Sequence, residues 1–175
     1  MPQASRLFAT TSWVIKVATF LSLALVAVLV LAVGALMLAS LGLFAIPLPD
    51  SLTHGLPIQA VLLAAAVVVV ACAVVVALAA MILVLVGRIV ESARIGDPFV
   101  VKNATRLNTI GGLLLASQAV GLVAGIFVSA LPKQLNLNFD FDVSLSGLFA
   151  ALLVFVLAQI FRHGAMMREE LEGTV

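Results

Sequence analysis

The sequence has few charged residues and a single cysteine, and both shortages exclude classes of protein. Only 10% of the 175 residues are Asp, Glu, Lys or Arg, whereas 64% are hydrophobic. A soluble domain of this length could not bury so much apolar surface in one core, so the chain is expected in a membrane. The lone Cys72 leaves neither a disulfide framework nor a cluster of thiolate metal ligands within one chain.

The hydrophobic residues are gathered in four long blocks that short polar stretches separate. Blocks of this length cross a bilayer as helices, and they show no barrel-like alternation of polar and apolar residues. The sequence therefore predicts an all-α, integral membrane four-helix bundle in one transmembrane domain, residues 1–175. The first block is too long for a cleaved signal peptide. Helices are expected at about 14–44, 57–94, 98–131 and 144–171, with membrane-spanning parts at about 17–43, 60–86, 110–131 and 143–161.

The few basic residues are distributed unevenly between the two sides of the predicted bundle. Eight of the nine Lys and Arg residues precede the first helix, follow the fourth, or lie between the second and third, and only Lys133 lies on the other side. Positive residues near helix ends favour the cytoplasmic side. Both termini and the 87–109 segment are therefore expected in the cytoplasm, and the basic cluster of this segment is explained in part as a topology signal.

The stretch "RIGDPFVVKN" is more ordered than a topology signal requires. Gly96 suits the left-handed residue that closes a helix, Asp97 suits an N-cap, and Pro98 suits the first turn of the next helix. The second and third helices are thus expected to form a long hairpin that extends beyond the membrane, with this turn as its tip.

These residues resemble a family. "GDPFVVKNATRLNTIGG" and the tail "FRHGAMMREELEGTV" resemble the bacterial membrane family known as domain of unknown function 2975. The matching positions are Gly96, Pro98, Phe99, Asn103, Leu107, Ile110 and Gly111, then Gly164, Glu169, Glu170, Thr174 and Val175. Members are often encoded beside a small Xre-type helix-turn-helix regulator, so the resemblance implies that the protein tethers or controls such a regulator. It implies no catalytic residue.

Polar groups are scarce inside the predicted spans. No ionisable residue lies in the interior of any block, which weighs against an ion or proton pathway. Residues Ser117, Gly121, Gly125 and Ser129 recur every four positions, a pattern that lets another helix approach closely, either within the bundle or from a second copy in a homodimer. Gln118 is expected to donate a hydrogen bond to a neighbouring helix.

The expected outer loops hold the remaining candidates for ligand binding. Residues 135–143 alternate between apolar and polar side chains, which predicts a short strand-like segment between the third and fourth helices. Asp140 and Asp142 share the polar face of this segment, and Asp50 and His54 lie in the other outer loop. These four form either a solvated surface or, if the loops meet, a site for a cation, although their spacing matches no defined metal motif. No cofactor is expected.

The acidic tail has two interpretations. It pairs with the basic segment of the same molecule, or it forms a joint docking surface with the tip of the hairpin. The hypothetical docking residues are Arg94, Gly96, Asp97, Pro98, Phe99, Lys102, Asn103, Arg106, Arg168, Glu169, Glu170 and Glu172.

Two functions of different class follow as hypotheses. The first is a non-catalytic, multi-pass protein of the bacterial inner membrane that binds a small cytoplasmic helix-turn-helix transcription regulator and does not itself contact nucleic acid. The second is a small carrier or lipid-interacting protein for apolar molecules. An enzyme is not expected, because no nucleophile, base and orienting group occur at a recognisable spacing.

Overall fold

The computed structural model describes residues 2–43, 56–96, 98–129 and 144–172. These residues form four long helices and no strand: α1 (Pro2–Ser40), α3 (Ile58–Ile95), α4 (Val101–Ser129) and α5 (Leu145–Glu172). All four helices are long and apolar enough to cross a membrane. The predicted all-α four-helix architecture is therefore confirmed for the part of the chain that the structure describes.

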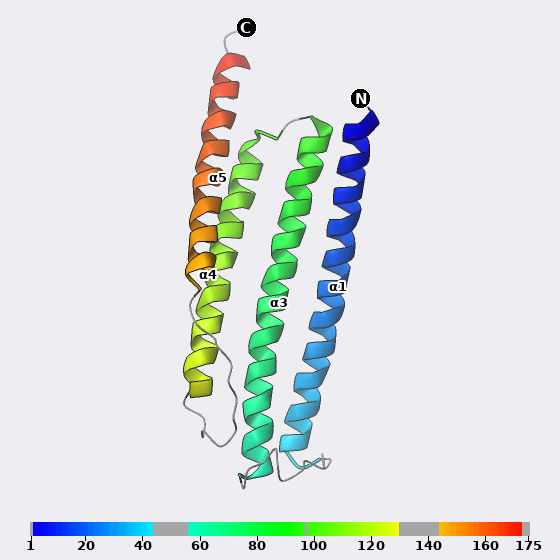
Figure 1. Cartoon of the computed structure of the whole chain (residues 1–175), viewed down its shortest axis with the longest axis vertical. Helices are drawn as coiled ribbons and strands as arrows, with labels where there is room; N and C mark the ends of the chain where they lie inside the picture. The colour runs from blue at the N-terminus through cyan, green and yellow to red at the C-terminus, as the bar shows by residue number, and fades with distance from the viewer. Residues whose placement is uncertain (1, 44–55, 97, 130–143, 173–175) are drawn as a thin grey trace.

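The helices pack in chain order rather than around a common centre. The main contacts join α1 to α3, α3 to α4 and α4 to α5, and Figure 1 shows the four helices side by side in that sequence. Successive helices run in opposite directions, so the N-terminal end of α1, the turn between α3 and α4, and the C-terminal end of α5 lie at the same end of the molecule (Figure 1).

Two helices differ from the expected bounds near their starts. α1 begins at Pro2, well before the expected start at about residue 14. Proline is tolerated in a first helical turn, where its missing N–H would have no partner anyway, and no other proline precedes Ile46. α4 begins at Val101 rather than at about 98, because the preceding residues make a separate set of contacts, described below.

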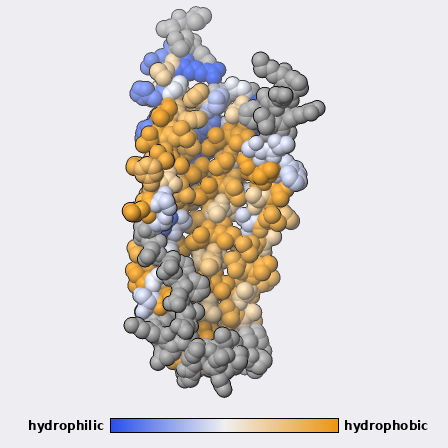
Figure 2. All heavy atoms as spheres, in the orientation of Figure 1, coloured by the Kyte–Doolittle hydropathy of each residue, from blue (hydrophilic) through white to orange (hydrophobic). Residues whose placement is uncertain are grey.

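Most apolar side chains point away from the bundle. Large hydrophobic residues are exposed along all four helices, including Phe20, Leu31, Val123 and Ile160. Figure 2 shows a mainly hydrophobic surface along the helices, with hydrophilic atoms near the C-terminal end of α5. In lipid such a surface needs no cover, because acyl chains are as apolar as the side chains.

A buried hydrophobic cluster joins α3, α4 and α5 near that hydrophilic end. Leu107 and Ile110 of α4 and Ala158 of α5 form its centre. Its periphery consists of Ile82, Leu85, Val86, Ile89, Leu114, Val154 and Phe161. The beginning of α4 is therefore packed against α3 and α5 close to the α3–α4 turn.

Candidate docking site at the polar end

The candidate site lies at the end of the molecule where charged side chains gather. We call this region the polar end, and it comprises residues 88–106 together with residues 162–170. Figure 2 shows blue, hydrophilic atoms at this end, next to the mainly orange surface of the helices. The exposed residues here include Arg88, Arg94, Lys102, Arg162, His163, Arg168, Glu169 and Glu170.

Gly96 closes α3 in the predicted conformation. Its φ of 117° and ψ of −4° lie in the left-handed region, and its backbone N–H donates to the carbonyl of Ser92. Only glycine, which has no Cβ, adopts such a φ without a steric cost. The helix that follows starts at Val101, so Pro98 does not occupy its first turn as expected. Asp97, the expected N-cap, lies outside the described residues.

Asn103 fastens the start of α4 to the end of α3. Its side-chain amide donates to Ser92 Oγ at 2.6 Å and to the Pro98 carbonyl at 2.9 Å. Its Oδ1 accepts a hydrogen bond from Arg106 Nη1 at 2.8 Å, and the same nitrogen donates to the Arg88 carbonyl at 3.0 Å. Asn103 has 0% exposure, so in this conformation it holds the turn and cannot itself touch a partner.

Phe99 connects the turn to α5. Its ring lies 5.1 Å from that of Phe161, centroid to centroid, at a tilt of 36°, which is within the usual range for paired aromatic rings. It also covers Gly164, where an added Cβ would lie 3.1 Å from Phe99 Cδ1. The tip of the hairpin and the base of the acidic tail therefore form one packed unit.

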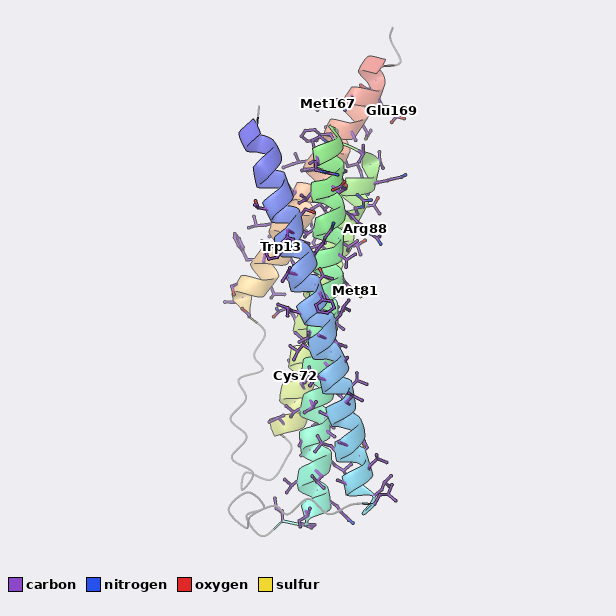
Figure 3. The ribbon with its side chains drawn as sticks, turned by 90° about the vertical axis from the view of Figure 1, so that its right-hand side faces the viewer. Trp13, Cys72, Met81, Arg88, Met167 and Glu169 are labelled. Carbon is purple, nitrogen blue, oxygen red and sulfur yellow. The ribbon has the colours of Figure 1, made fainter. Side chains whose placement is uncertain are left out.

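An open apolar groove runs beside this contact. We call it the Phe99 groove. It has a volume of about 750 Å³ and is lined by Phe99, Gln159, Ile160, His163, Gly164 and Met167. Figure 3 shows Met167 near the C-terminal end of α5, close to Glu169. Methionine and phenylalanine make an adaptable apolar surface of the kind that accepts an amphipathic helix.

The described lining of this groove includes none of the charged docking residues. Arg94 forms an ion pair with Glu91 of its own helix at 2.6 Å, and so is not paired with the tail. Lys102 and Glu169 are exposed on α4 and α5. Glu172 lies in the last turn of α5, but its side chain is outside the described part of the structure.

The small-residue ladder of α4 is not where α4 and α5 come closest. An added Cβ at Gly121 would meet no atom within 4 Å, and Ser117 and Ser129 donate to carbonyls of their own helix. Close contacts lie at Gly111, where an added Cβ would sit 2.8 Å from the Phe155 ring, and at Gly147 of α5, where it would meet the Gln118 amide. The alternative role of the ladder, including Gly125, as a homodimer face stays a prediction.

Gln118 makes a hydrogen bond between helices, but as an acceptor rather than the expected donor. Its Oε1 accepts from the backbone N–H of Ser144 at 3.0 Å, just before α5 begins. A side chain at position 147 would collide with the Gln118 amide, so Gly147 leaves space for it. Gln118 thus satisfies one of the unpaired N–H groups at the start of a helix.

The candidate ligands of the outer loops lie beyond the described residues. Asp50, His54, Asp140 and Asp142 belong to the segments 44–55 and 130–143, as does the expected strand-like segment. Within the described ranges, no three His, Cys, Asp or Glu residues are grouped as metal ligands.

Sequence reasoning assigned no contact to three residues of the polar end, of which Gly164 was named only as a family position. Ser92 receives the Asn103 amide, Gly164 admits the Phe99 ring, and Met167 lines the groove. The role of Ser92 depends on the burial of the Asn103 amide, which requires hydrogen-bond partners and which the sequence does not reveal. The contacts of Gly164 and Met167 depend on how α5 is rotated about its axis. An apolar sequence does not reveal this rotation.

Residues 56–175 match the family described as "Protein of unknown function (DUF2975)". The match covers α3, α4 and α5, together with the turn and tail that carry the resemblance, and it begins after α1. No curated protein and no solved structure has a detectable similarity to the chain.

Proposed function

The chain belongs to the DUF2975 family of unknown function, and from the geometry of its polar end we propose that it is a non-catalytic membrane protein that docks a small cytoplasmic helix-turn-helix regulator. The proposed place is the bacterial inner membrane, with the polar end in the cytoplasm. Holding the regulator there would keep it from DNA.

The observation that carries this proposal is the Phe99 groove, an apolar groove at the polar end of the molecule. Its lining is mainly apolar, although His163 lies next to the charged Arg162 and Met167 lies next to the charged Arg168 at the polar end. An apolar groove flanked by charge suits the amphipathic helices of a small helical protein. Exposed residues of both signs, such as Lys102 and Glu169, would then determine the register of the bound helix.

The contacts that hold the residues beside the turn support the same proposal. Asn103 and Gly96 fix the backbone, and the Phe99–Phe161 contact fixes the turn against α5. A preformed surface loses less conformational entropy on binding than a mobile loop, so more of the contact energy is available for affinity. A topology signal alone would need none of these contacts.

The decisive experiment compares two adjacent methionines. Met167 lines the groove, whereas Met166 is 50% exposed and does not. Tagged full-length protein carrying Met167→Glu or Met166→Glu is purified from its native membrane in mild detergent, and the co-purifying proteins are identified by mass spectrometry. We expect a small DNA-binding protein to accompany the unmodified chain and Met166→Glu, and to be lost from Met167→Glu.

Two results would remove the support for docking. One is the absence of any cytoplasmic protein from all three samples, and the other is equal recovery of the regulator with both variants. The competing proposal, a carrier for apolar molecules, would then be tested by uptake into liposomes. The observation in its favour is a second apolar groove of about 300 Å³ between α1 and α3, lined by Val26, Val30, Val33, Val70, Ala73, Val74 and Ala77.

A further inference from the structure

A third groove, between α1 and α3, combines a basic rim with an apolar wall. We call it the α1–α3 groove. It has a volume of about 790 Å³. Its lining consists of Ser12, Trp13, Ile15, Lys16, Thr19, Phe20 and Leu23 of α1, and Leu83, Val84, Gly87, Arg88, Glu91 and Arg94 of α3. Below the charged residues, the lining continues into the span from Thr19 to Leu23 on α1 and from Gly87 to Leu83 on α3.

The rim carries an excess of positive charge. Glu91 and Arg94 neutralise each other through their 2.6 Å ion pair. The side chains of Lys16 and Arg88 are exposed, and neither forms an ion pair or hydrogen bond with the described residues. Two uncompensated cations therefore face the same groove from different helices.

The wall below the rim is apolar, as the acyl chains of a lipid are. Phe20, Leu23, Leu83 and Val84 supply large apolar side chains. The Thr19 hydroxyl beside them donates to the Ile15 carbonyl at 2.8 Å, so it presents no unpaired donor to the groove. The other hydroxyl of the lining, that of Ser12, lies nearer the N-terminal end of α1. A ligand lying on this wall would need to be apolar along its length.

The level of Trp13 indicates where the bilayer surface lies. Trp13 is 66% exposed, and tryptophan concentrates at the boundary between headgroups and acyl chains. In Figure 3, Trp13 of α1 and Arg88 of α3 lie at about the same height, above Met81. The two helices approach each other closely at this level, since a Cβ added at Gly87 would lie 3.2 Å from Ile15 Cγ2. The basic rim thus lies at headgroup depth and the apolar wall at acyl-chain depth.

We propose that the α1–α3 groove binds an anionic phospholipid. Its phosphate lies between Lys16 and Arg88, and one acyl chain lies along Phe20, Leu23, Leu83 and Val84. Arginine and lysine are the usual partners of phosphate groups, and basic pockets between membrane helices bind anionic headgroups. A free phosphate would use the rim alone and leave the continuous apolar wall without a role, so the whole groove favours a lipid. This inference is independent of the proposed regulator.

The only tryptophan of the chain supplies the measurement. The sequence has one Trp and no Tyr, so its fluorescence at long wavelength reports on Trp13 in the groove. The full-length protein is reconstituted in phosphatidylcholine bilayers that contain a small fraction of either brominated phosphatidylglycerol or brominated phosphatidylcholine. Bromine quenches tryptophan only at short range, so the ratio of the two quenching curves gives the relative affinity of the groove for the anionic lipid.

We expect stronger quenching by the anionic lipid at equal mole fraction. Lys16→Gln and Arg88→Gln should each lower the relative affinity roughly fivefold, the effect of one basic residue near an anionic surface, and the double variant should abolish the preference. Lys102→Gln/Arg162→Gln removes the same charge from the same end outside the groove, so it should keep the preference. Val84→Phe fills the apolar wall with all charges intact and should also weaken quenching by the anionic lipid.

Several outcomes would overturn the proposal. Equal quenching by both lipids would show that the groove does not select a charge. Weak quenching by both would show that protein, and not lipid, covers Trp13. An equal loss of preference in the two double variants would indicate a diffuse surface potential rather than a site. Displacement of the lipid by soluble glycerol phosphate at millimolar concentration would indicate an anion site that ignores the apolar wall.

Discussion

At the scale of single residues, Asn103 is the most constrained side chain that the structure describes. It is fully buried, and both ends of its amide are hydrogen-bonded, to Ser92, Pro98 and Arg106. A polar group is tolerated in such a position only because its hydrogen bonds replace those lost from water. The chemical identity of residue 103 should therefore matter more than its size.

Replacing Asn103 by alanine should loosen the α3–α4 turn. The substitution leaves the Pro98 carbonyl without this donor, and we expect a loss of about 1–3 kcal/mol in the free energy of unfolding. Asn108 lies on the same helix but is exposed, so Asn108→Ala serves as the matched control. Thermal unfolding in detergent micelles measures the stability, and hydrogen exchange of the backbone amides of residues 98–103 measures the turn. Equal behaviour of the two variants would show that the Asn103 hydrogen bonds contribute nothing.

At the scale of helices, the contact between α4 and α5 depends on a glycine with a close neighbour. An added Cβ at Gly111 would lie 2.8 Å from two atoms of the Phe155 ring, whereas the same atom at Gly112 would meet nothing within 4 Å. The sequence places these two glycines side by side. Only the packing of α5 distinguishes them.

Alanine substitutions at these two glycines should change stability in opposite directions. Gly111→Ala forces the Phe155 ring away and should cost about 1–3 kcal/mol, whereas Gly112→Ala replaces an exposed helical glycine and should stabilise by up to about 1 kcal/mol. Both variants are compared with the unmodified protein by unfolding in micelles. Phe155→Leu should reduce the cost of Gly111→Ala, because it removes the colliding ring. A cost of equal size for both glycines would mean that the α4–α5 contact is not as described.

The helices themselves were predictable, but their packing was not. Apolar blocks and the closing Gly96 follow from elementary rules of helix length and backbone conformation, and both were confirmed. In a soluble bundle, alternation of polar and apolar residues would also reveal which face is buried. Here α3 is apolar on every side from Ala60 to Val86, so nothing in its periodicity separates the face toward α1 from the face toward lipid.

The polar end shows the same division between predictable and unpredictable features. The sequence pointed to the turn and the tail because they hold most of the charge and the motif residues. It could not show that Asn103 is buried, because an asparagine beside Lys102 in a basic loop is ordinarily exposed. Its burial follows from the tertiary contact with Ser92, which is eleven residues away.

At the scale of the whole molecule, the arrangement of the helix ends makes orientation testable with single cysteines. The N-terminal end of α1, the α3–α4 turn and the C-terminal end of α5 share one end of the bundle (Figure 1). The basic residues are concentrated at that end, which favours the cytoplasmic side of the membrane. Lys102 and Met167 are exposed there, whereas Leu43 is exposed at the opposite end of α1.

We expect opposite labelling patterns at the two ends. In a Cys72→Ser background, Leu43→Cys should react with a membrane-impermeant maleimide in cells whose outer barrier is permeabilised and whose inner membrane is intact. Lys102→Cys and Met167→Cys should react only after the inner membrane is opened, because the intact membrane keeps the maleimide out of the cytoplasm. Labelling of Met167→Cys in intact cells would place the polar end outside and separate it from any cytoplasmic regulator. Such a result would contradict the proposed docking function but would leave the α1–α3 groove available to lipid, so the two proposals can fail separately.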